Sequence, residues 1–404
     1  MAEGMASSQR KARGGWSRRI IAGALALALS ACSTVVPKGP QGPVERPQPT
    51  RQTGPAQPTI TTAIPQDVAR QRVALLVPLS GANAGVGQSI ANATQMAVLD
   101  SRSDRLRITS YDTAQGAAAA AQRALADGNK LILGPLLAED VRAVAPIAHQ
   151  AGVPLITFSN DASVGGSGTY LLGYSPVQSI TRVVDFARSK GMTDFAGLVP
   201  NELYGERAST AFLRAVEQAG GKVLSLQTYD RGPGGLGAAV ARLAKNGPYQ
   251  AVLIAGSSGV AATSVPLLRK NGAAAKAEIL GTELWNADTG ISGVAALDGA
   301  WFASVSNGLY RQYADKYRAR FGKSPYRLSS LGYDAVLLTV RIARDWPVGR
   351  AFPESKLRDG DGFAGIDGAF RFGRDGIAER ALEVQEIQGG SLVTVSPAPA
   401  SFGK

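Results

Sequence analysis

Runs of consecutive apolar residues alternate with amphipathic segments along most of this chain. Residues 73–77 are five apolar residues in a row, a pattern typical of a strand buried on both faces in a parallel sheet. Pro78 ends the run, because proline has no N–H to donate to a neighbouring strand. Small residues such as Gly85 and Gly87 then form a loop, and from Gln88 onward the apolar residues share one face of a helix. The segment therefore predicts a strand, a loop and a helix, the first unit of an α/β domain.

The same alternation continues to about residue 344. It predicts further strands at residues 106–111, 131–133, 153–157, 194–199, 222–229, 251–255 and 278–281, and helices at 114–126, 138–151, 177–190, 204–220, 234–245, 260–271, 309–321 and 328–344. Because the connections are short and the two kinds of element alternate, the strands should be parallel and flanked by helices. A length of 404 residues exceeds one ordinary core, which favours two lobes.

Polar and small residues gather at the ends of several predicted strands. A loop that begins with Ser80 and Gly81 follows the first strand, and Ser159, Asn160 and Asp161 follow the fourth. Ligands of open α/β sheets bind outside the carboxyl ends of the strands. We therefore expect these residues to line one wall of a binding cleft.

Composition argues against several functional classes. The chain has one cysteine, Cys32, and one histidine, His149, which are too few for a zinc site built from such ligands. A single cysteine also excludes a disulfide within the chain. The formal net charge is +12, but the basic residues are scattered and do not alternate with aromatic ones, so nucleic-acid binding is not expected. The glycine-rich segments 85–87 and 256–259 lack the complete dinucleotide and hydrolase motifs. We therefore expect no enzyme activity, no catalytic residue, no metal and no cofactor.

Residues 1–31 have the pattern of a targeting leader. Basic residues up to Arg19 precede an apolar stretch at 20–29, which is too short to span a bilayer. The sequence Leu-Ser-Ala-Cys that follows resembles the lipobox of bacterial lipoproteins. The resemblance implies that Cys32 carries a lipid, and that the anchor lies in the outer membrane, because Ser33 rather than an aspartate follows it. The alternative is ordinary signal cleavage that leaves a free thiol.

A proline-rich segment at 32–71 separates the predicted lipid from the predicted fold. Such a composition cannot bury a core and favours a disordered, extended tether, about 100 Å long at roughly 3.1 Å per residue. It is either a means of reaching a distant partner or a passive linker, and the sequence favours neither.

Several stretches resemble type I periplasmic binding proteins, in particular the leucine/isoleucine/valine-binding branch. They are Val-Pro-Leu-Ser-Gly at 77–81, Leu-Gly-Pro-Leu-Leu at 133–137 and Gly-Val-Pro-Leu-Ile at 152–156. Tyr-Asp-Thr at 111–113 and Gly-Tyr-Ser-Pro at 173–176 look like the LppC-type lipoproteins, the penicillin-binding protein activators. The resemblance covers about residues 72–396 and implies a two-lobed, Venus-flytrap α/β fold, in which each lobe is a parallel sheet flanked by helices.

The resemblance also implies how the chain divides between the lobes. It predicts lobe 1 at 72–176 and 308–350, lobe 2 at 177–307 and 351–396, and a tail at 397–404. Tyr204 lies in a loop similar to the family's Tyr-Gly loop, and Glu283 falls where amino-acid binders place an acid for the ligand's ammonium group. Trp285 lies in the same loop as Glu283. These three residues are the expected second wall of the cleft.

Two functional hypotheses follow from the resemblance. The first is a lipid-anchored activator of a peptidoglycan synthase (a penicillin-binding protein), which acts in cell-wall synthesis by contact with that protein. The alternative is the solute-binding protein of an ABC importer for amino acids of the branched-chain type. The family's binders use a serine after the Gly-x-Leu turn for the ligand carboxylate, whereas Leu137 and Ala138 stand here. This difference favours the first hypothesis.

Overall fold

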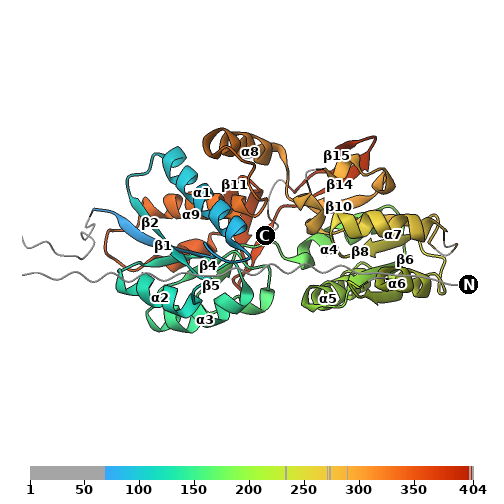
Figure 1. Ribbon diagram of the computed structural model, residues 1–404, viewed down its shortest axis with the longest axis horizontal. Helices are drawn as coiled ribbons and strands as arrows, with labels where there is room; N and C mark the ends of the chain where they lie inside the picture. Colours follow the sequence, from blue (N-terminus) through green and yellow to red (C-terminus); the bar gives the residue numbers. More distant parts are fainter. Residues whose placement is uncertain are drawn as a thin grey trace, which may run out of the picture. The chain divides into compact units, whose positions relative to one another are not determined.

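The computed structural model describes residues 69–399, apart from 233, 271, 273 and 289, together with residue 402. Its helices and strands all lie within residues 65–404, which form one compact unit. The predicted leader, Cys32 and most of the predicted tether lie outside the described residues. Within this unit the structure confirms two α/β lobes joined by crossing segments (Figure 1).

Lobe 1 is built on a five-stranded parallel sheet of spatial order β2–β1–β3–β4–β5. The strands are β1 (Gln71–Val77), β2 (Leu106–Asp112), β3 (Leu131–Leu133), β4 (Leu155–Thr157) and β5 (Thr169–Leu171). Side chains of β1 pack alternately on α1 (Ala84–Ser101) with α9 (Ser329–Ala343), and on α2 (Ala117–Ala126) with α3 (Ala138–Gln150). The short helix η1 (Ala162–Val164) precedes β5. The uninterrupted apolar run of β1 therefore lies between two layers of helices, as its sequence predicts.

Lobe 2 has a seven-stranded sheet of order β15–β14–β10–β9–β8–β6–β7. The strands are β6 (Asp194–Pro200), β7 (Lys222–Tyr229), β8 (Ala251–Ile254), β9 (Glu278–Gly281), β10 (Trp301–Ser304), β14 (Glu383–Gln388) and β15 (Ser391–Ser396). Helices α4 (Pro176–Ser189) and α5 (Leu203–Gln218) cover one face, and α6 (Gly235–Leu243) and α7 (Ser258–Lys270) cover the other. The short helices η2 (Glu283–Ala287), η3 (Ile291–Gly293) and η4 (Ala295–Leu297) follow β9. Only β14 and β15 are antiparallel to their neighbours in this sheet.

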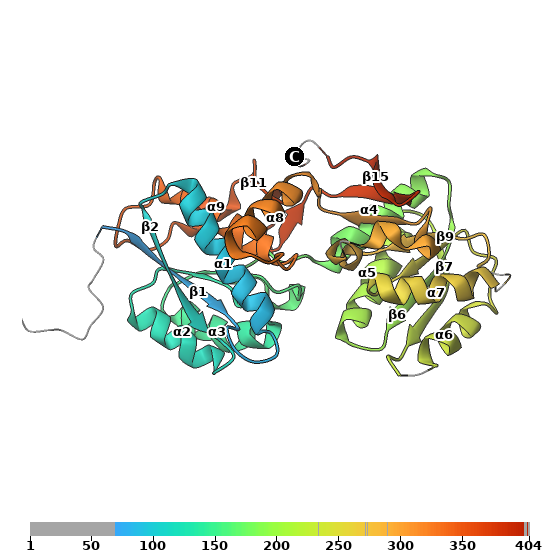
Figure 2. The same cartoon turned by 45° about the horizontal axis from the view of Figure 1, so that its top comes forward.

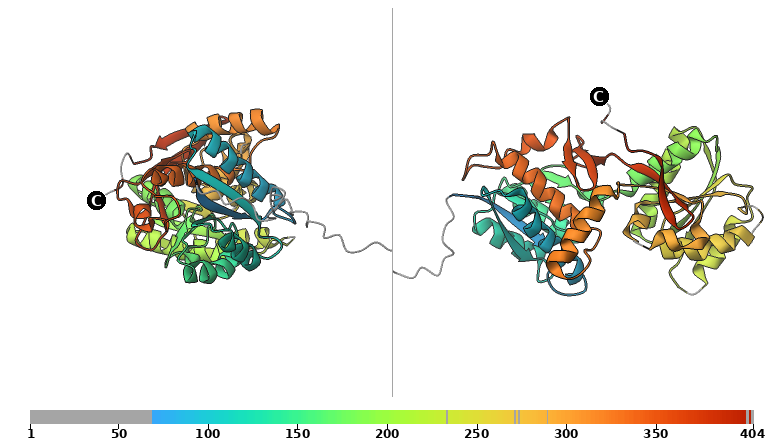
Figure 3. Two further views of the ribbon diagram at one scale, coloured as in Figure 1. Left: turned by 90° about the vertical axis from the view of Figure 1, so that its left-hand side faces the viewer. Right: turned by 90° about the horizontal axis from the view of Figure 1, so that it is seen from above.

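The residues after α9 correct the predicted division between the lobes. The helix η5 (Glu354–Arg358) and the small antiparallel sheet β11 (Phe363–Gly365), β12 (Gly368–Phe372) and β13 (Ala378–Arg380) share the core of lobe 1. The helix α8 (Gly308–Phe321) also packs on lobe 1, against α1. Of the predicted segment 351–396, only β14 and β15 lie in lobe 2 (Figures 2 and 3). The apolar pattern of a hairpin identifies its buried face but not the lobe that it covers.

Both lobes begin with the same close approach between a helix and the end of a strand. A Cβ atom on Gly87 would lie 1.8 Å from the carbonyl oxygen of Pro78, and one on Gly205 would lie 1.7 Å from that of Pro200. Glycine is required at both positions because any side chain would collide with the backbone. This contact fixes the loops that follow β1 and β6, which both run along the space between the lobes.

Candidate functional site

A cavity of about 320 Å³ lies between the two lobes. Lobe 1 contributes residues near the carboxyl ends of β1, β3 and β4, and lobe 2 contributes residues of α4, of η2 and of the segment after β10. Much of the wall is apolar and consists of Val86, Leu136, Leu137, Phe158, Leu284, Val305, Leu328 and Leu382. A cavity of this size and lining fits a small ligand with an apolar body.

Glu283 contributes a carboxyl group to this cavity from the start of η2. It accepts hydrogen bonds from Ser179 Oγ on α4 at 2.5 Å and from Tyr204 OH on α5 at 3.0 Å. Burial raises the pKa of Glu283, and the hydrogen bonds offset only part of that rise. No basic side chain among the described residues forms an ion pair with Glu283. The cavity therefore holds an acid without a cationic partner.

Asp161 connects the lobes through a cluster that we call the interlobe clasp, formed by Asp161, Arg142 and Arg207. The Asp161 side chain is 1% exposed, and its Oδ2 lies 2.7 Å from Arg142 Nη2 and 2.5 Å from Arg207 Nη2. Arg142 lies on α3 of the same lobe, whereas Arg207 lies on α5 of lobe 2. A second cavity, of about 340 Å³, has Asp161 and Arg207 in its wall. The clasp thus joins the lobes beside the open space between them.

The clasp also determines the ionisation of Asp161. Burial alone would raise its pKa. Ser163 donates hydrogen bonds to Asp161 Oδ1 through its backbone N–H at 2.9 Å and its hydroxyl at 2.6 Å. These bonds and the Arg207 guanidinium outweigh burial and lower the pKa of Asp161. The carboxylate is therefore ionised at neutral pH, and the clasp is a charged contact.

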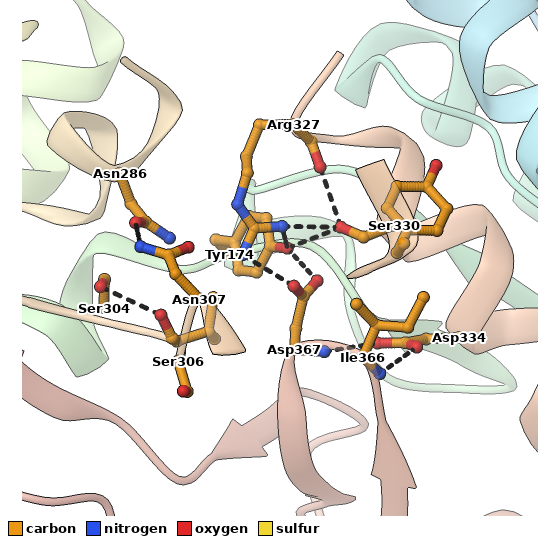
Figure 4. A network of polar contacts seen from close by, with 12 residues as sticks. Tyr174, Asn286, Ser304, Ser306, Asn307, Arg327, Ser330, Asp334, Ile366 and Asp367 are labelled. Carbon is orange, nitrogen blue, oxygen red and sulfur yellow. Dashed lines mark hydrogen bonds and ion pairs between the residues drawn. The ribbon is translucent and has the colours of Figure 1, made fainter. Parts of the chain in front are cut away.

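A buried ion pair contacts Tyr174, which lies just before α4, where the chain first passes from lobe 1 to lobe 2 (Figure 4). Arg327, just before α9, places Nη2 at 2.7 Å from Oδ1 of Asp367 in the turn between β11 and β12. The two side chains are 7% and 0% exposed. Tyr174 OH donates to the other oxygen of Asp367, and Arg327 Nη1 donates to Ser330 Oγ at 2.9 Å. The pair holds three segments that are distant in the sequence together at one wall of the cavity.

A second acid shares this buried region. Burial would raise the pKa of Asp367, but attraction to Arg327 and Arg380 outweighs it and holds the pKa below its ordinary value. Asp334 accepts a hydrogen bond from the backbone N–H of Ile366 at 2.7 Å. Burial and the charge of Asp367 raise the pKa of Asp334. Near neutral pH this region therefore contains one firmly ionised carboxylate and one that binds a proton more readily.

The structure brings only some of the predicted site residues to the cleft. Asn160 lines both cavities, Glu283 lines the first, and Asp161, Ser159 and Tyr204 line the second. The Ser159 hydroxyl accepts the backbone N–H of Asp161 at 3.1 Å and thereby shapes this loop.

Three predicted residues lie away from both cavities. The Ser80 hydroxyl donates to Asp112 at 2.6 Å, and Gly81 forms a turn with φ of 72°. Trp285 is 0% exposed and packs in the core of lobe 2, 5.8 Å from the ring of Phe302. The prediction that these residues line the cleft is corrected, because their neighbours Val86 and Leu284 take that place.

Sequence reasoning missed the arginines of the site. Arg207 lies three positions after Tyr204 in the first turns of α5, so the expected cleft position of Tyr204 also indicated that Arg207 faces the cleft. Nothing in the local pattern indicated Arg327 or Asp367, because their pairing depends on the packing of β11 and β12 on lobe 1.

Two further features are absent from the described residues. These residues contain no group of three or more histidine, cysteine, aspartate or glutamate residues arranged to hold a metal ion. None of the described helices combines the length and the apolar composition needed to cross a membrane.

Comparison with known proteins agrees with this geometry. A family model described as periplasmic binding protein matches residues 70–391. A putative branched-chain amino acid ABC transporter protein of Rhodospirillum rubrum is 20% identical with a TM-score of 0.71, and the alignment covers 81% of this chain and 100% of the other. A leucine-binding protein of Thermotoga maritima is 21% identical with a TM-score of 0.61, covering 82% and 99% of the two chains.

Two further relatives extend the comparison. A solute-binding protein of Rhodopseudomonas palustris in complex with 3,4-dihydroxybenzoic acid is 18% identical with a TM-score of 0.63, covering 83% of this chain and 97% of the other. An uncharacterized protein of Rickettsia prowazekii is 24% identical over 176 residues, which are 43% of this chain and 47% of that protein. The chain thus spans about half the length of this curated relative. Because the family model covers most of the sequence, the chain belongs to the periplasmic binding protein family.

Proposed function

We propose that this protein is a periplasmic solute receptor that captures a small ligand between its lobes and delivers it to an ABC importer. The observation that carries the proposal is the largely apolar cavity with Glu283, an acid without a cationic partner, in its wall. The relatives named for leucine, for branched-chain amino acids and for 3,4-dihydroxybenzoic acid share the fold. Such a receptor binds its ligand reversibly and is not an enzyme.

The cavity supports an amino-acid-like ligand in two respects. An ammonium group beside Glu283 would supply the missing opposite charge and favour the ionised carboxylate. The leucines and Phe158 would surround an apolar side chain. At the carboxylate end, Leu137 and Ala138 offer no hydroxyl. Lobe 1 instead supplies the carboxamides of Asn83 and Asn160 and the guanidinium groups of Arg327 and Arg380 to the cavity wall.

A second candidate function is an activator of a peptidoglycan synthase. Its support is that the clasp joins the lobes through the protein's own side chains, while Ser179 and Tyr204 already bind Glu283. Such a cleft would set the shape of a surface for a protein partner. Mixing residues 65–404 with a purified synthase and measuring the rate of glycan polymerisation tests this function, and an unchanged rate argues against it.

We further propose that the protein is anchored in the periplasm through a lipid on Cys32, with residues 32–71 as a tether to the outer membrane. The lipobox-like sequence supports this proposal. A Cys32→Ser variant should then move from the membrane fraction to the soluble periplasmic fraction, and an unchanged distribution would contradict the anchor.

Thermal unfolding of residues 65–404 with a panel of amino acids and aromatic acids tests the receptor function. A ligand at 100 times its dissociation constant stabilises the folded state by about 2.7 kcal/mol, which raises the midpoint by several degrees. Glu283→Gln is the matched variant, because it keeps the size of the side chain and one acceptor oxygen and removes the charge. If an amino acid is the ligand, this variant should lose the shift. A flat response of the native protein across a broad panel would contradict the proposal.

A further inference from the structure

The amino ends of the strands in lobe 1 form a surface at the end of the lobe away from lobe 2 (Figures 1 and 2). β1, β2 and β3 begin there in register, with Gln71 paired to Leu106 and Val73 paired to Leu131. Helices α1, α2 and α9 run back from the cleft side and end there. We call this surface the amino-end pole. Because the candidate ligand site lies at the carboxyl ends of the strands, the two are separate.

Basic residues are concentrated at the amino-end pole. Eight of them flank the strand beginnings and helix ends, against four acidic residues. The basic residues are Arg70, Arg72, Arg102, Arg105, Arg107, Arg123, Lys130 and Arg344, and the acidic ones are Asp100, Asp104, Asp127 and Asp345. Two contacts show that these segments are neighbours: Arg105 Nη1 donates to the carbonyl of Arg344 at 3.4 Å, and Arg72 Nη1 to that of Asp127 at 2.6 Å. This surplus of positive charge favours an anionic partner.

Apolar groups are exposed at the same pole. Leu99 near the end of α1 is 54% exposed, and Val348 is 46% exposed. Val348 lies two residues after Trp346, whose carbonyl accepts a hydrogen bond from Gln71 at the start of β1. A hollow of about 350 Å³ opens beside the edge strand β2, and its lining includes Arg70, Val98, Leu99, Leu106, Arg107 and Ile108. The pole thus combines basic side chains with exposed apolar ones, as do protein surfaces that bind at a membrane interface.

We propose that the amino-end pole docks on an anionic phospholipid surface. Its guanidinium groups pair with lipid phosphates, and Leu99 and Val348 enter the headgroup region. The described part of the chain begins at this pole, since β1 starts at Gln71. A lipid on Cys32, which the sequence predicts, would attach the chain to the same membrane through the tether at residues 32–71, which leads to this pole.

This docking has a consequence for orientation. With the amino-end pole on the membrane, the strands of lobe 1 run away from the lipid, and the cleft and lobe 2 face the aqueous space. The proposal does not depend on which ligand or partner the cleft binds.

The test is co-sedimentation of residues 65–404 with lipid vesicles, since this unit contains every described helix, strand and hydrophobic core. Vesicles of phosphatidylcholine are compared with vesicles that contain phosphatidylglycerol. The pole variant carries Arg102→Glu and Arg105→Glu. The matched control carries Arg214→Glu and Lys222→Glu, the same change of charge at exposed positions of lobe 2. Thermal unfolding of each variant verifies that it is folded.

Each basic residue close to an anionic membrane contributes about a fivefold gain in binding. We therefore expect the native protein to bind the phosphatidylglycerol vesicles in a salt-sensitive manner, and the pole variant to bind more than tenfold more weakly. The control should keep most of the native affinity. Equal losses in both variants would show binding by overall charge alone and would overturn the proposal, as would absence of binding to the anionic vesicles. Stronger binding of residues 65–404 to an acidic protein than to the anionic vesicles would assign the pole to a protein partner instead. That result would also overturn the proposal.

Discussion

The interlobe clasp makes a quantitative prediction about opening of the cleft. Replacing Arg207 by methionine removes the only partner of Asp161 in the clasp that comes from lobe 2. A charge-assisted hydrogen bond to a buried carboxylate contributes about 1.5–3 kcal/mol. Because the Arg207 side chain is 24% exposed, solvent screening reduces this figure, and we expect about 1–2 kcal/mol. The ratio of closed to open molecules should then fall roughly 5- to 30-fold.

Energy transfer between dyes on the two lobes measures this ratio. The only native cysteine is Cys32, so residues 65–404 have none, and the substitutions Asp104→Cys and Glu217→Cys place one label on each lobe. Arg142→Met is the matched control, since Arg142 binds the same carboxylate but lies in the same lobe as Asp161. Opening in the Arg207 variant alone is the expected result. Equal opening in both variants, or none in either, would refute the reasoning.

The clasp also has a predicted dependence on pH. The pKa of Asp161 is lower in the folded protein than in the unfolded chain. Its contribution is therefore fully present above the unfolded value of about 3.9, and it is lost as the pH falls through the still lower folded value. The energy-transfer signal of the native protein should stay constant between pH 5 and 8. A transition between pH 5 and 8 that disappears in the Asp161→Asn variant would contradict the lowered pKa of Asp161.

Three further predictions concern stability, each measured by denaturant unfolding. Gly205→Ala should cost several kcal/mol, because the added Cβ would lie 1.7 Å from a backbone carbonyl oxygen. Gly237→Ala on α6 has open space around the added Cβ and should stabilise the fold by about 0.5–1 kcal/mol. Equal effects of the two substitutions would refute the steric argument. The pKa of Glu283 is raised on folding, so the ionisation of Glu283 destabilises the fold as pH rises above about 4.3. Glu283→Gln should therefore flatten this part of the profile of stability against pH. An unaltered profile would contradict the prediction. Asp367→Asn leaves a buried arginine without its ion-pair partner and should cost about 3–5 kcal/mol, and a loss below 1 kcal/mol would show that the pair is not buried as described.

The fold was largely predictable because its signals are local. The run at 73–77 has no polar alternation, and β1 is indeed buried between two helix layers. Two strands of the main sheets, β5 and β10, escaped prediction. They are as short as β3 and β8, but they lack the uninterrupted run of aliphatic residues that reveals those two strands. The lobe of the hairpin β11–β12 was also mispredicted, because the side that a hairpin covers depends on long-range packing.

The candidate site was predictable only where the topology alone decides it. The carboxyl ends of the strands do form the cleft, and Asn160, Tyr204 and Glu283 lie there. Which side chain of a loop turns inward depends on local geometry, and Trp285 turns into the core while Leu284 faces the cavity. Asp161 was expected in the cleft wall, but its ion pair with Arg207 joins residues 46 positions apart on different lobes, a relation that no sequence pattern encodes.

The measurement that tests the receptor function most directly is a titration of the dye-labelled protein with the panel of amino acids and aromatic acids. A solute receptor should give a saturable change in energy transfer with one ligand, and the same dissociation constant should be obtained from calorimetry. Glu283→Gln should weaken that binding if the ligand carries an ammonium group. The contrary result has two parts: no member of the panel alters the energy transfer, yet the Arg207→Met variant still opens. The protein would then have a working hinge but no solute, which would contradict the proposed function.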